Sequence, residues 1–317
     1  MKKMLQLIAL LLAAALFTAC GAPDVQSRAE DNKLSVYASF YTMYDFAKKI
    51  GGEKADIFVM VPDGTEPHDW EPAASDIAGL EHADVFVYNG AGMEHWAEDI
   101  LASLNNDALV VVEASKGIAL REGHGHEDEG EEAHAEEEAG EEEHDFDPHV
   151  WLDPNNAKLE LAAIKDAFIK ADAANASYYE ANYEKWAAEF DALDKAFRDT
   201  LSGVSHQEII VAHEAYGYLC AAYGLTQIGI EGLSPDSEPD PKRMAEIIEL
   251  AREKNVTTIF FEEMLSPDVA NAIAEETGAN TAVLSPVEGL TDSERGAGDD
   301  YLSVMYKNLE ALKAALL

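Results

Sequence analysis

Short apolar, β-prone runs alternate with helical segments along most of the chain, and this alternation restricts the fold more than any other feature. In the first half the expected strands are 34–40, 56–61, 85–89 and 109–113. The pattern restarts later, with expected strands at 208–212, 225–230, 257–262 and 281–284. Strands that alternate with helices form parallel β-α units. The sequence therefore predicts an α/β protein with two lobes, each built on a mainly parallel sheet.

A long helical segment separates the two alternating halves. Residues 155–171 have a helical pattern, and large apolar residues then recur at three- and four-residue steps from 177 to about 201. At 1.5 Å per residue the second of these helices would be about 37 Å long, enough to run along two stacked lobes. We therefore expect an N-terminal lobe over 33–155, a rigid helical connector over 156–203 and a C-terminal lobe over 204–317.

The start of the chain has the pattern of a bacterial targeting segment. A basic start precedes an apolar run from Leu5 to Phe17, which is shorter than the roughly 20 residues that a membrane-spanning helix needs. Small residues precede Cys20, as in a lipobox, although Phe17 stands where Leu is usual. We expect a lipoprotein signal peptide over 1–19, lipidation of Cys20 and a polar tether over 20–32. A simple secretory signal with an incidental cysteine is the alternative.

The segment 121–147 differs in kind from the rest because it has no hydrophobic period. Between 122 and 147 it contains fourteen acidic residues and four histidines, which are His124, His126, His134 and His144. Such a segment buries too little apolar surface to offset its chain entropy, so we expect a disordered loop inserted into the N-terminal lobe. The imidazoles favour a weak metal-collecting role for this loop, and a merely solvated linker is the alternative.

The charge and cysteine content exclude several kinds of site. The 62 acidic and 22 basic residues give a formal net charge of -40, which disfavours contact with the phosphates of nucleic acid. Only Cys20 and Cys220 are present, so the chain has neither a disulfide framework nor a cysteine-rich metal cluster. Cys220 lies in an apolar stretch and is interpreted as a small buried hydrophobic residue.

Three histidines lie where the expected fold would gather ligands. His68 and His149 stand in loops bounded by prolines, which restrict the backbone, and His213 follows the apolar run 209–212. In open α/β sheets, ligands bind beyond the carboxyl ends of the strands. Each histidine alone is more often structural, but the three together indicate a metal site, because neutral imidazole is a preferred ligand of Zn²⁺. The remaining histidines are interpreted as surface or core residues: His82, His95 and His206.

Three motifs carry a resemblance that extends over the whole chain. The motifs EPHDWEP at 66–72, DPHVWLDP at 147–154 and HEAYGYL at 213–219 resemble, in order and spacing, the ligand motifs of the metal-binding receptors of bacterial ABC importers. The acidic, histidine-rich insertion is similar to that of the zinc-uptake branch of this family. Residues 286–291 resemble the segment that supplies a fourth, carboxylate position. The resemblance implies two α/β lobes joined by a long helix, with the metal in the cleft between them.

The same resemblance implies a ligand set. His68 and His149 would come from the first lobe and His213 and Glu288 from the second, so that a bound ion holds the cleft closed. The manganese branch usually has a carboxylate where this chain has His213, and three nitrogens with one oxygen suit Zn²⁺ better. Water or a loop histidine is the alternative to Glu288. Carboxylates that could accept the imidazole N–H groups, or be merely solvated, are Asp63, Glu66 and Glu214.

These observations predict a receptor rather than an enzyme. We expect a monomeric, lipid-anchored protein, outside the cytoplasm or in the periplasm, that binds Zn²⁺ as cargo and delivers it to an ABC permease and its ATPase. The alternatives are a manganese or iron receptor of the same fold, a secreted zinc hydrolase, and an adhesin with a structural metal. The hydrolase is disfavoured because His213-Glu214 lacks the second histidine of a His-Glu-x-x-His motif.

Overall fold

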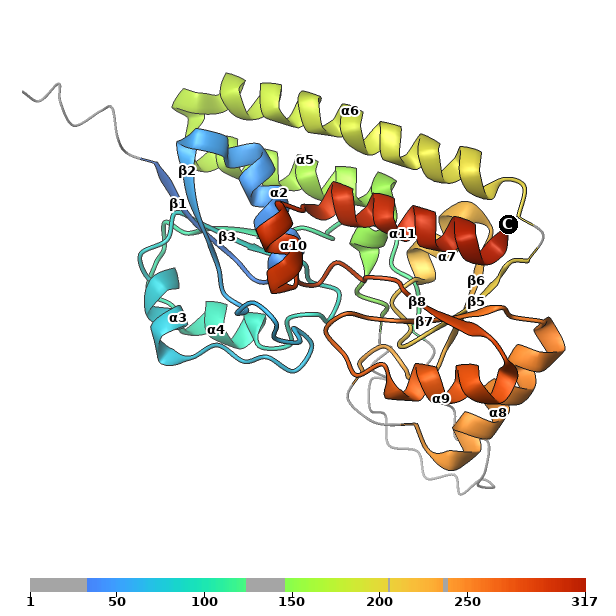
Figure 1. Cartoon of the computed structure of the whole chain (residues 1–317). Helices are drawn as coiled ribbons and strands as arrows, with labels where there is room; N and C mark the ends of the chain where they lie inside the picture. The colour runs from blue at the N-terminus through green and yellow to red at the C-terminus, as the bar shows by residue number, and fades with distance from the viewer. Residues whose placement is uncertain (1–32, 124–145, 205, 236–238) are drawn as a thin grey trace, which may run out of the picture. The chain divides into compact units, whose positions relative to one another are not determined.

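Two four-stranded parallel sheets form the frame of the protein (Figure 1). The computed structural model describes residues 33–123, 146–204, 206–235 and 239–317. The first sheet has the order β2-β1-β3-β4 and the second the order β6-β5-β7-β8, with every pair parallel. The strands are β1 (Leu34–Ala38), β2 (Ala55–Val59), β3 (Val85–Tyr88), β4 (Val110–Glu113), β5 (Glu208–Val211), β6 (Thr226–Gly229), β7 (Thr258–Phe261) and β8 (Asn280–Val283). The predicted α/β class with a parallel sheet in each lobe is confirmed.

Helices cover both faces of each sheet. In the first lobe these are α2 (Tyr41–Gly51), followed by the short 3-10 helix η1 (Gly52–Lys54), α3 (Ala74–Leu80) and α4 (Ala97–Ser103). In the second they are α7 (Gly217–Tyr223), α8 (Pro241–Lys254), α9 (Asp268–Thr277) and α11 (Tyr301–Leu316), while α10 (Asp292–Ala297) lies in the connection between β8 and α11. Coverage on both sides explains why an inner strand such as β3, with the sequence VFVY, is apolar at successive positions. In β3, for example, Val85 and Val87 belong to the core that contains Phe46 of α2, while Phe86 packs with Trp96 beside α4.

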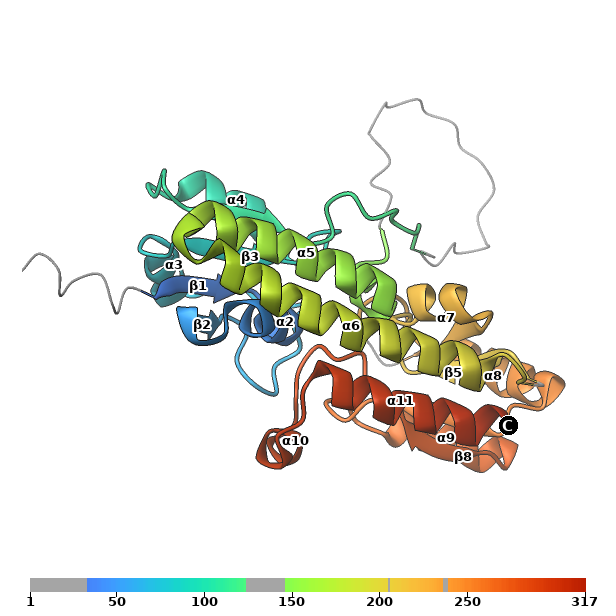
Figure 2. The ribbon, with the colours of Figure 1, turned by 90° about the horizontal axis from the view of Figure 1, so that it is seen from above.

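The connector between the lobes is a pair of helices. The short helix η2 (Val150–Leu152) leads into α5 (Pro154–Ala171), whose first turn is capped by the Asp153 carboxylate accepting from the Asn155 N–H. A second short helix, η3 (Ala173–Asn175), turns the chain into α6 (Ala176–Leu201), which lies beside α5 (Figure 2). Phe190 and Phe197 of α6 belong to the same apolar core as Val36 of β1 and Val211 of β5. The connector therefore packs against both lobes: α5 contacts β3 and β4 of the first sheet, and α6 contacts α2 of the first lobe and α7 and α11 of the second.

The strands end earlier than the sequence predicts. The expected strand 34–40 ends at Ala38, and 56–61 ends at Val59, because the residues that follow already turn toward the loops at the carboxyl edge. One helix, α10, was not predicted. Its capping box was visible in the sequence, since the Thr291 hydroxyl accepts from the Glu294 N–H and the Glu294 carboxylate accepts from the Thr291 N–H.

Several predicted features lie outside the described residues. These are the signal peptide, the tether and the lipidation site Cys20, together with the loop histidines His124, His126, His134 and His144. Among the residues that the structure does describe, no helix is both long and apolar enough to cross a membrane.

Candidate metal centre

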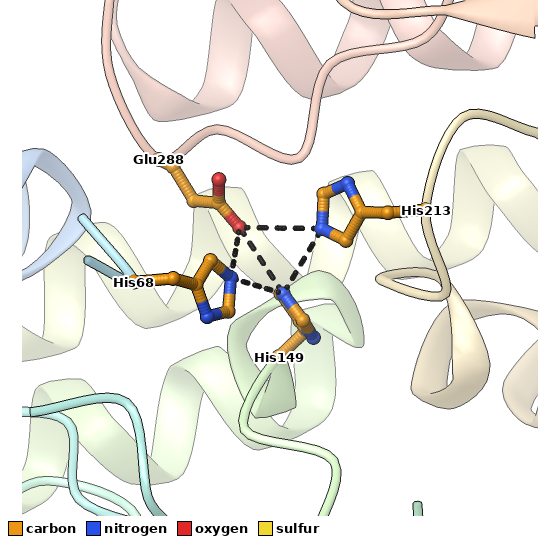
Figure 3. A group of neighbouring side chains, drawn as sticks. All are labelled: His68, His149, His213 and Glu288. Carbon is orange, nitrogen blue, oxygen red and sulfur yellow. Dashed lines mark hydrogen bonds and ion pairs between the residues drawn. The ribbon is translucent and has the colours of Figure 1, made fainter. Parts of the chain in front are cut away.

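Four side chains from four separate loops point toward one another (Figure 3). They are the predicted residues His68, His149, His213 and Glu288, and one ligand atom of each lies within 4.8 Å of the others. His68 follows β2, His213 follows β5, and Glu288 follows β8, while His149 immediately precedes η2. The carboxyl ends of strands from both sheets therefore supply three of the four side chains, as expected for a ligand site in open α/β sheets.

Five of the six distances between the four ligand atoms lie between 3.1 and 3.8 Å, and the sixth pair lies within 4.8 Å. His149 Nε2 lies 3.1 Å from His68 Nε2 and 3.3 Å from His213 Nε2. Glu288 Oε1 lies 3.1 Å from His149 Nε2, 3.5 Å from His68 Nε2 and 3.8 Å from His213 Nε2. A tetrahedral Zn²⁺ with bonds of about 2.0–2.1 Å separates its ligand atoms by about 3.3 Å. The arrangement has the size and the donor atoms that such an ion requires.

Two carboxylates fix the orientation of the buried imidazoles. Nδ1 of His149 lies 2.9 Å from Asp147 Oδ1, and Nδ1 of His213 lies 2.6 Å from Glu262 Oε1. An ionised carboxylate can only accept, so each Nδ1 carries a proton, and each Nε2 is the nitrogen that faces the centre and can bind a metal once it is deprotonated. Asp147 Oδ1 also accepts from the His149 backbone N–H at 3.0 Å, which holds the motif in a tight local turn.

Other carboxylates were predicted for this role, namely Asp63, Glu66 and Glu214. Asp63 instead forms an ion pair with Arg295 at 2.7 Å, and Glu66 accepts from the backbone N–H of His68 at 3.3 Å. The carboxylates that face Nδ1 of His149 and His213 are Asp147 and Glu262, which the sequence did not single out. Glu262 directly follows β7, so the strand-end rule that selected His213 would also have selected it.

The centre is closed to solvent. The side chains of His149 and His213 are fully buried, and those of His68 and Glu288 are 7% and 2% exposed. Trp151, also fully buried, lies beside His149 with ring centroids 5.3 Å apart. The remaining cysteine, Cys220, is buried outside this group, and burial raises the pKa of its thiol to about 12.

Burial and neighbouring charge set the protonation of the centre. Burial lowers the pKa of His68. Burial acts in the same direction on His213, but the carboxylates of Glu262 and Glu288 outweigh it and raise its pKa to about 10. Burial alone would raise the pKa of Glu288, yet hydrogen bonds from His149 and His68 hold that pKa far below its usual range. Without a metal, the centre keeps an ionised Glu288 and a protonated His213.

Known proteins share this sequence and architecture. Residues 36–315 match the family described as zinc-uptake complex component A, periplasmic, or ZnuA. The chain belongs to the ZnuA family. This membership confirms the resemblance predicted from the three histidine motifs. It also places the chain among the components of a zinc-uptake complex.

Individual ZnuA relatives extend this result. The high-affinity zinc uptake system protein ZnuA of Bacillus subtilis (strain 168) is 44% identical over 304 residues, which cover 95% of this chain and 94% of that protein. The zinc-binding lipoprotein AdcA of Streptococcus pneumoniae serotype 4 is 38% identical over 313 residues, 99% of this chain but only 61% of AdcA. This chain therefore spans about three fifths of that relative's length.

A solved ZnuA-like structure has the same fold. The Zn(II)-bound ZnuA-like domain of Streptococcus pneumoniae AdcA superposes with a TM-score of 0.77 at 34% sequence identity, covering 90% of this chain and 99% of that domain. The match covers nearly all of that domain, so this chain and the AdcA domain share one architecture.

Proposed function

We propose that this chain is a receptor that captures one Zn²⁺ outside the cytoplasm and delivers it to the permease and ATPase of an ABC importer. The observation that carries the proposal is the convergence of three imidazole nitrogens and one carboxylate oxygen within 4.8 Å of one another, contributed by His68, His149, His213 and Glu288. The names of the relatives, which describe zinc uptake and zinc binding, support the same cargo.

The donor atoms favour zinc over manganese. Carboxylate, carbonyl and water oxygens suit Mn²⁺, whereas imidazole nitrogens suit Zn²⁺. Three of the four donors here are nitrogens, because His213 supplies Nε2 and its carboxylate partner Glu262 contacts Nδ1 instead of facing the centre. A manganese receptor of the same fold remains the second candidate, and it is distinguished by competition between the two metals.

The geometry also favours a receptor over a zinc hydrolase. A catalytic zinc site keeps one coordination position open for water or substrate, whereas a closed site has four protein ligands. Glu288 occupies the fourth corner, 3.1 Å from His149 Nε2, and its side chain is almost completely buried. A fully coordinated and buried ion is suited to being carried, and its release requires the protein to open.

Three further features belong to this proposal. The protein is a monomer held at the outer face of the membrane through lipidated Cys20, in line with the lipoprotein name of a relative. The four histidines of the segment 121–147 collect Zn²⁺ weakly and raise its concentration near the centre. Their binding is weaker than that of the centre, because a segment of this composition must lose chain entropy to gather its ligands around an ion.

Calorimetric titration of the metal-stripped protein tests this function. We expect one tight Zn²⁺ site that Mn²⁺ fails to displace, with additional weak sites that vanish when 124–145 is deleted. Replacing His68, His149 or His213 by Ala should weaken the tight site well over tenfold, since altering even the partners of zinc ligands costs about 10–100-fold. The exposed His206→Ala is the matched control. Full affinity in all three ligand variants, or displacement by Mn²⁺, would refute the assignment.

A further inference from the structure

The residue before Glu288 has a backbone conformation that its side chain disfavours. Among the described residues, the non-glycine residues with positive φ are Ala91, Asn255 and Val287. Asn255 ends helix α8, where asparagine is common, but Val287 is β-branched and has φ of 61°. Its side chain is completely buried. Such a conformation persists only where surrounding structure imposes it.

The groups that impose it belong largely to the other lobe. The backbone carbonyls before and after the Val287 Cα both accept hydrogen bonds from the first lobe: Trp151 Nε1 donates to Pro286 O at 2.7 Å, and the Thr42 hydroxyl of α2 donates to Val287 O. Both contacts are buried. From its own lobe, the segment is held by Ser285 Oγ, which accepts from the Val287 N–H at 3.2 Å.

The hydrogen bonds that hold Val287 lie one residue from the candidate metal ligand Glu288. Rotation about the Val287 backbone would redirect Glu288, whose Oε1 is 3.1 Å from His149 Nε2. We propose that Val287 and Thr42 are positioning residues: contact between the lobes forces Val287 into the left-handed conformation, which places Glu288 in the centre. The proposal rests on the zinc-binding function proposed above. When the lobes separate and the Thr42 contact is lost, Val287 returns to negative φ and Glu288 leaves the ion, so zinc release is linked to opening.

Two substitutions at one position isolate the backbone effect. Val287→Gly and Val287→Ala both remove the buried side chain, but only glycine adopts positive φ without a steric penalty. If the strain exists only in the closed, metal-bound form, the glycine variant should bind Zn²⁺ about fivefold to thirtyfold more tightly than the alanine variant. The measurements are the equilibrium affinity of the full-length protein and the rate of Zn²⁺ loss to a chelator, which should be slower for glycine.

A second pair of variants tests the interlobe contact without touching the strained residue. Thr42→Val removes the hydroxyl while nearly keeping the shape, and it should speed Zn²⁺ loss about twofold to tenfold. Thr257→Val is the matched control, because its hydroxyl also donates to a backbone carbonyl, that of Ala315 at 3.2 Å, away from the centre. This control should lose Zn²⁺ at the rate of the unaltered protein.

The outcomes separate the two proposals. Equal Zn²⁺ affinity of the glycine and alanine variants would mean that Val287 keeps its conformation in the open protein, and this would overturn the inference. Identical release from Thr42→Val and Thr257→Val would overturn it too. In both cases the unaltered protein still binds Zn²⁺ tightly. Failure of the unaltered protein to bind Zn²⁺ would instead contradict the proposed function itself.

Discussion

At the scale of single residues, Glu262 favours the protonated form of His213, and zinc must displace a proton from that imidazole to bind. Its carboxylate lies 2.6 Å from His213 Nδ1 and contributes to raising the His213 pKa, against the effect of burial, to about 10. His213 is therefore protonated at neutral pH in the metal-free protein, and only its neutral form can bind the ion through Nε2. Zinc affinity should rise with pH from 6.5 to 8.5, by about tenfold per unit for each displaced proton. Titrations in buffers of different ionisation enthalpy will count the protons released.

Replacing the acceptor tests this account. Glu262→Gln keeps an oxygen that can accept from Nδ1 but removes the charge, so the His213 pKa should fall and the pH dependence of binding should move to lower pH. Affinity at pH 8.5 should fall about 10–100-fold, as for other partners of zinc ligands. The neighbouring Glu263→Gln serves as control, because no imidazole contact is seen for Glu263. A Glu262→Gln protein with unaltered affinity and pH profile would show that Glu262 does not act on His213.

The candidate ligands were predictable from the sequence, whereas their orienting partners were harder to find. His68, His149 and His213 stand in motifs whose prolines and strand ends mark them locally. Glu262 lies 49 residues from His213, and only the packing of β7 beside β5 brings them together. Asp147 is only two residues from His149. Its role was still not predicted, because sequence spacing alone does not determine which nearby carboxylate contacts the Nδ1 of a histidine.

At the scale of elements, α5 carries a buried acid that the centre does not use. Glu160 is fully buried, and neither carboxylate oxygen has a hydrogen-bond partner among the described residues. Burial, with a smaller contribution from the charge of Glu94, raises its pKa well above the usual range. The folded pKa exceeds the unfolded one, so Glu160 costs stability above the unfolded pKa, and the cost grows as pH rises.

Replacing Glu160 by an apolar side chain of similar length should therefore stabilise the protein. We expect Glu160→Met to increase the free energy of unfolding at pH 7.5 by about 1–3 kcal/mol, the cost of an unsatisfied buried polar group, and by less at pH 4. Denaturant unfolding at both pH values checks this. The control is Glu189→Met, on the exposed face of α6, which should change little. A lower free energy of unfolding for Glu160→Met at pH 7.5 would mean that the Glu160 carboxyl group has hydrogen-bond partners in solution.

The order of elements follows from the sequence, but their ends and pairing do not. Alternating apolar runs predicted parallel β-α units in both halves, and the structure has them. In each sheet the first strand in sequence, β1 or β5, is an inner strand. This strand order depends on the geometry of the crossover connections, and no local sequence pattern predicts it. The helix α10 was missed because it is only one and a half turns long and has little apolar periodicity, although Thr291 and Glu294 mark its start.

At the scale of the whole molecule, one apolar core joins the lobes. It contains Val36 of the first sheet, Val211 of the second, and Phe190 and Phe197 of α6, a helix that contacts α2 of the first lobe and α7 and α11 of the second. A shared core of this kind couples the lobes, so residues 34–317 should unfold in a single cooperative transition. Scanning calorimetry should give equal calorimetric and van't Hoff enthalpies for the metal-free protein.

Zinc should shift that single transition as a whole, because its proposed ligands come from both lobes. At a free concentration 100 times the Kd, binding adds about 2.7 kcal/mol to the free energy of unfolding. The same Zn²⁺ concentration should leave the transition of His213→Ala nearly unmoved, while His206→Ala should respond like the unaltered protein. Two resolved transitions, with only one moved by Zn²⁺, would show that the lobes fold independently. The ion would then be held by one lobe, and coordination by His213 and Glu288 together with His68 and His149 would be excluded.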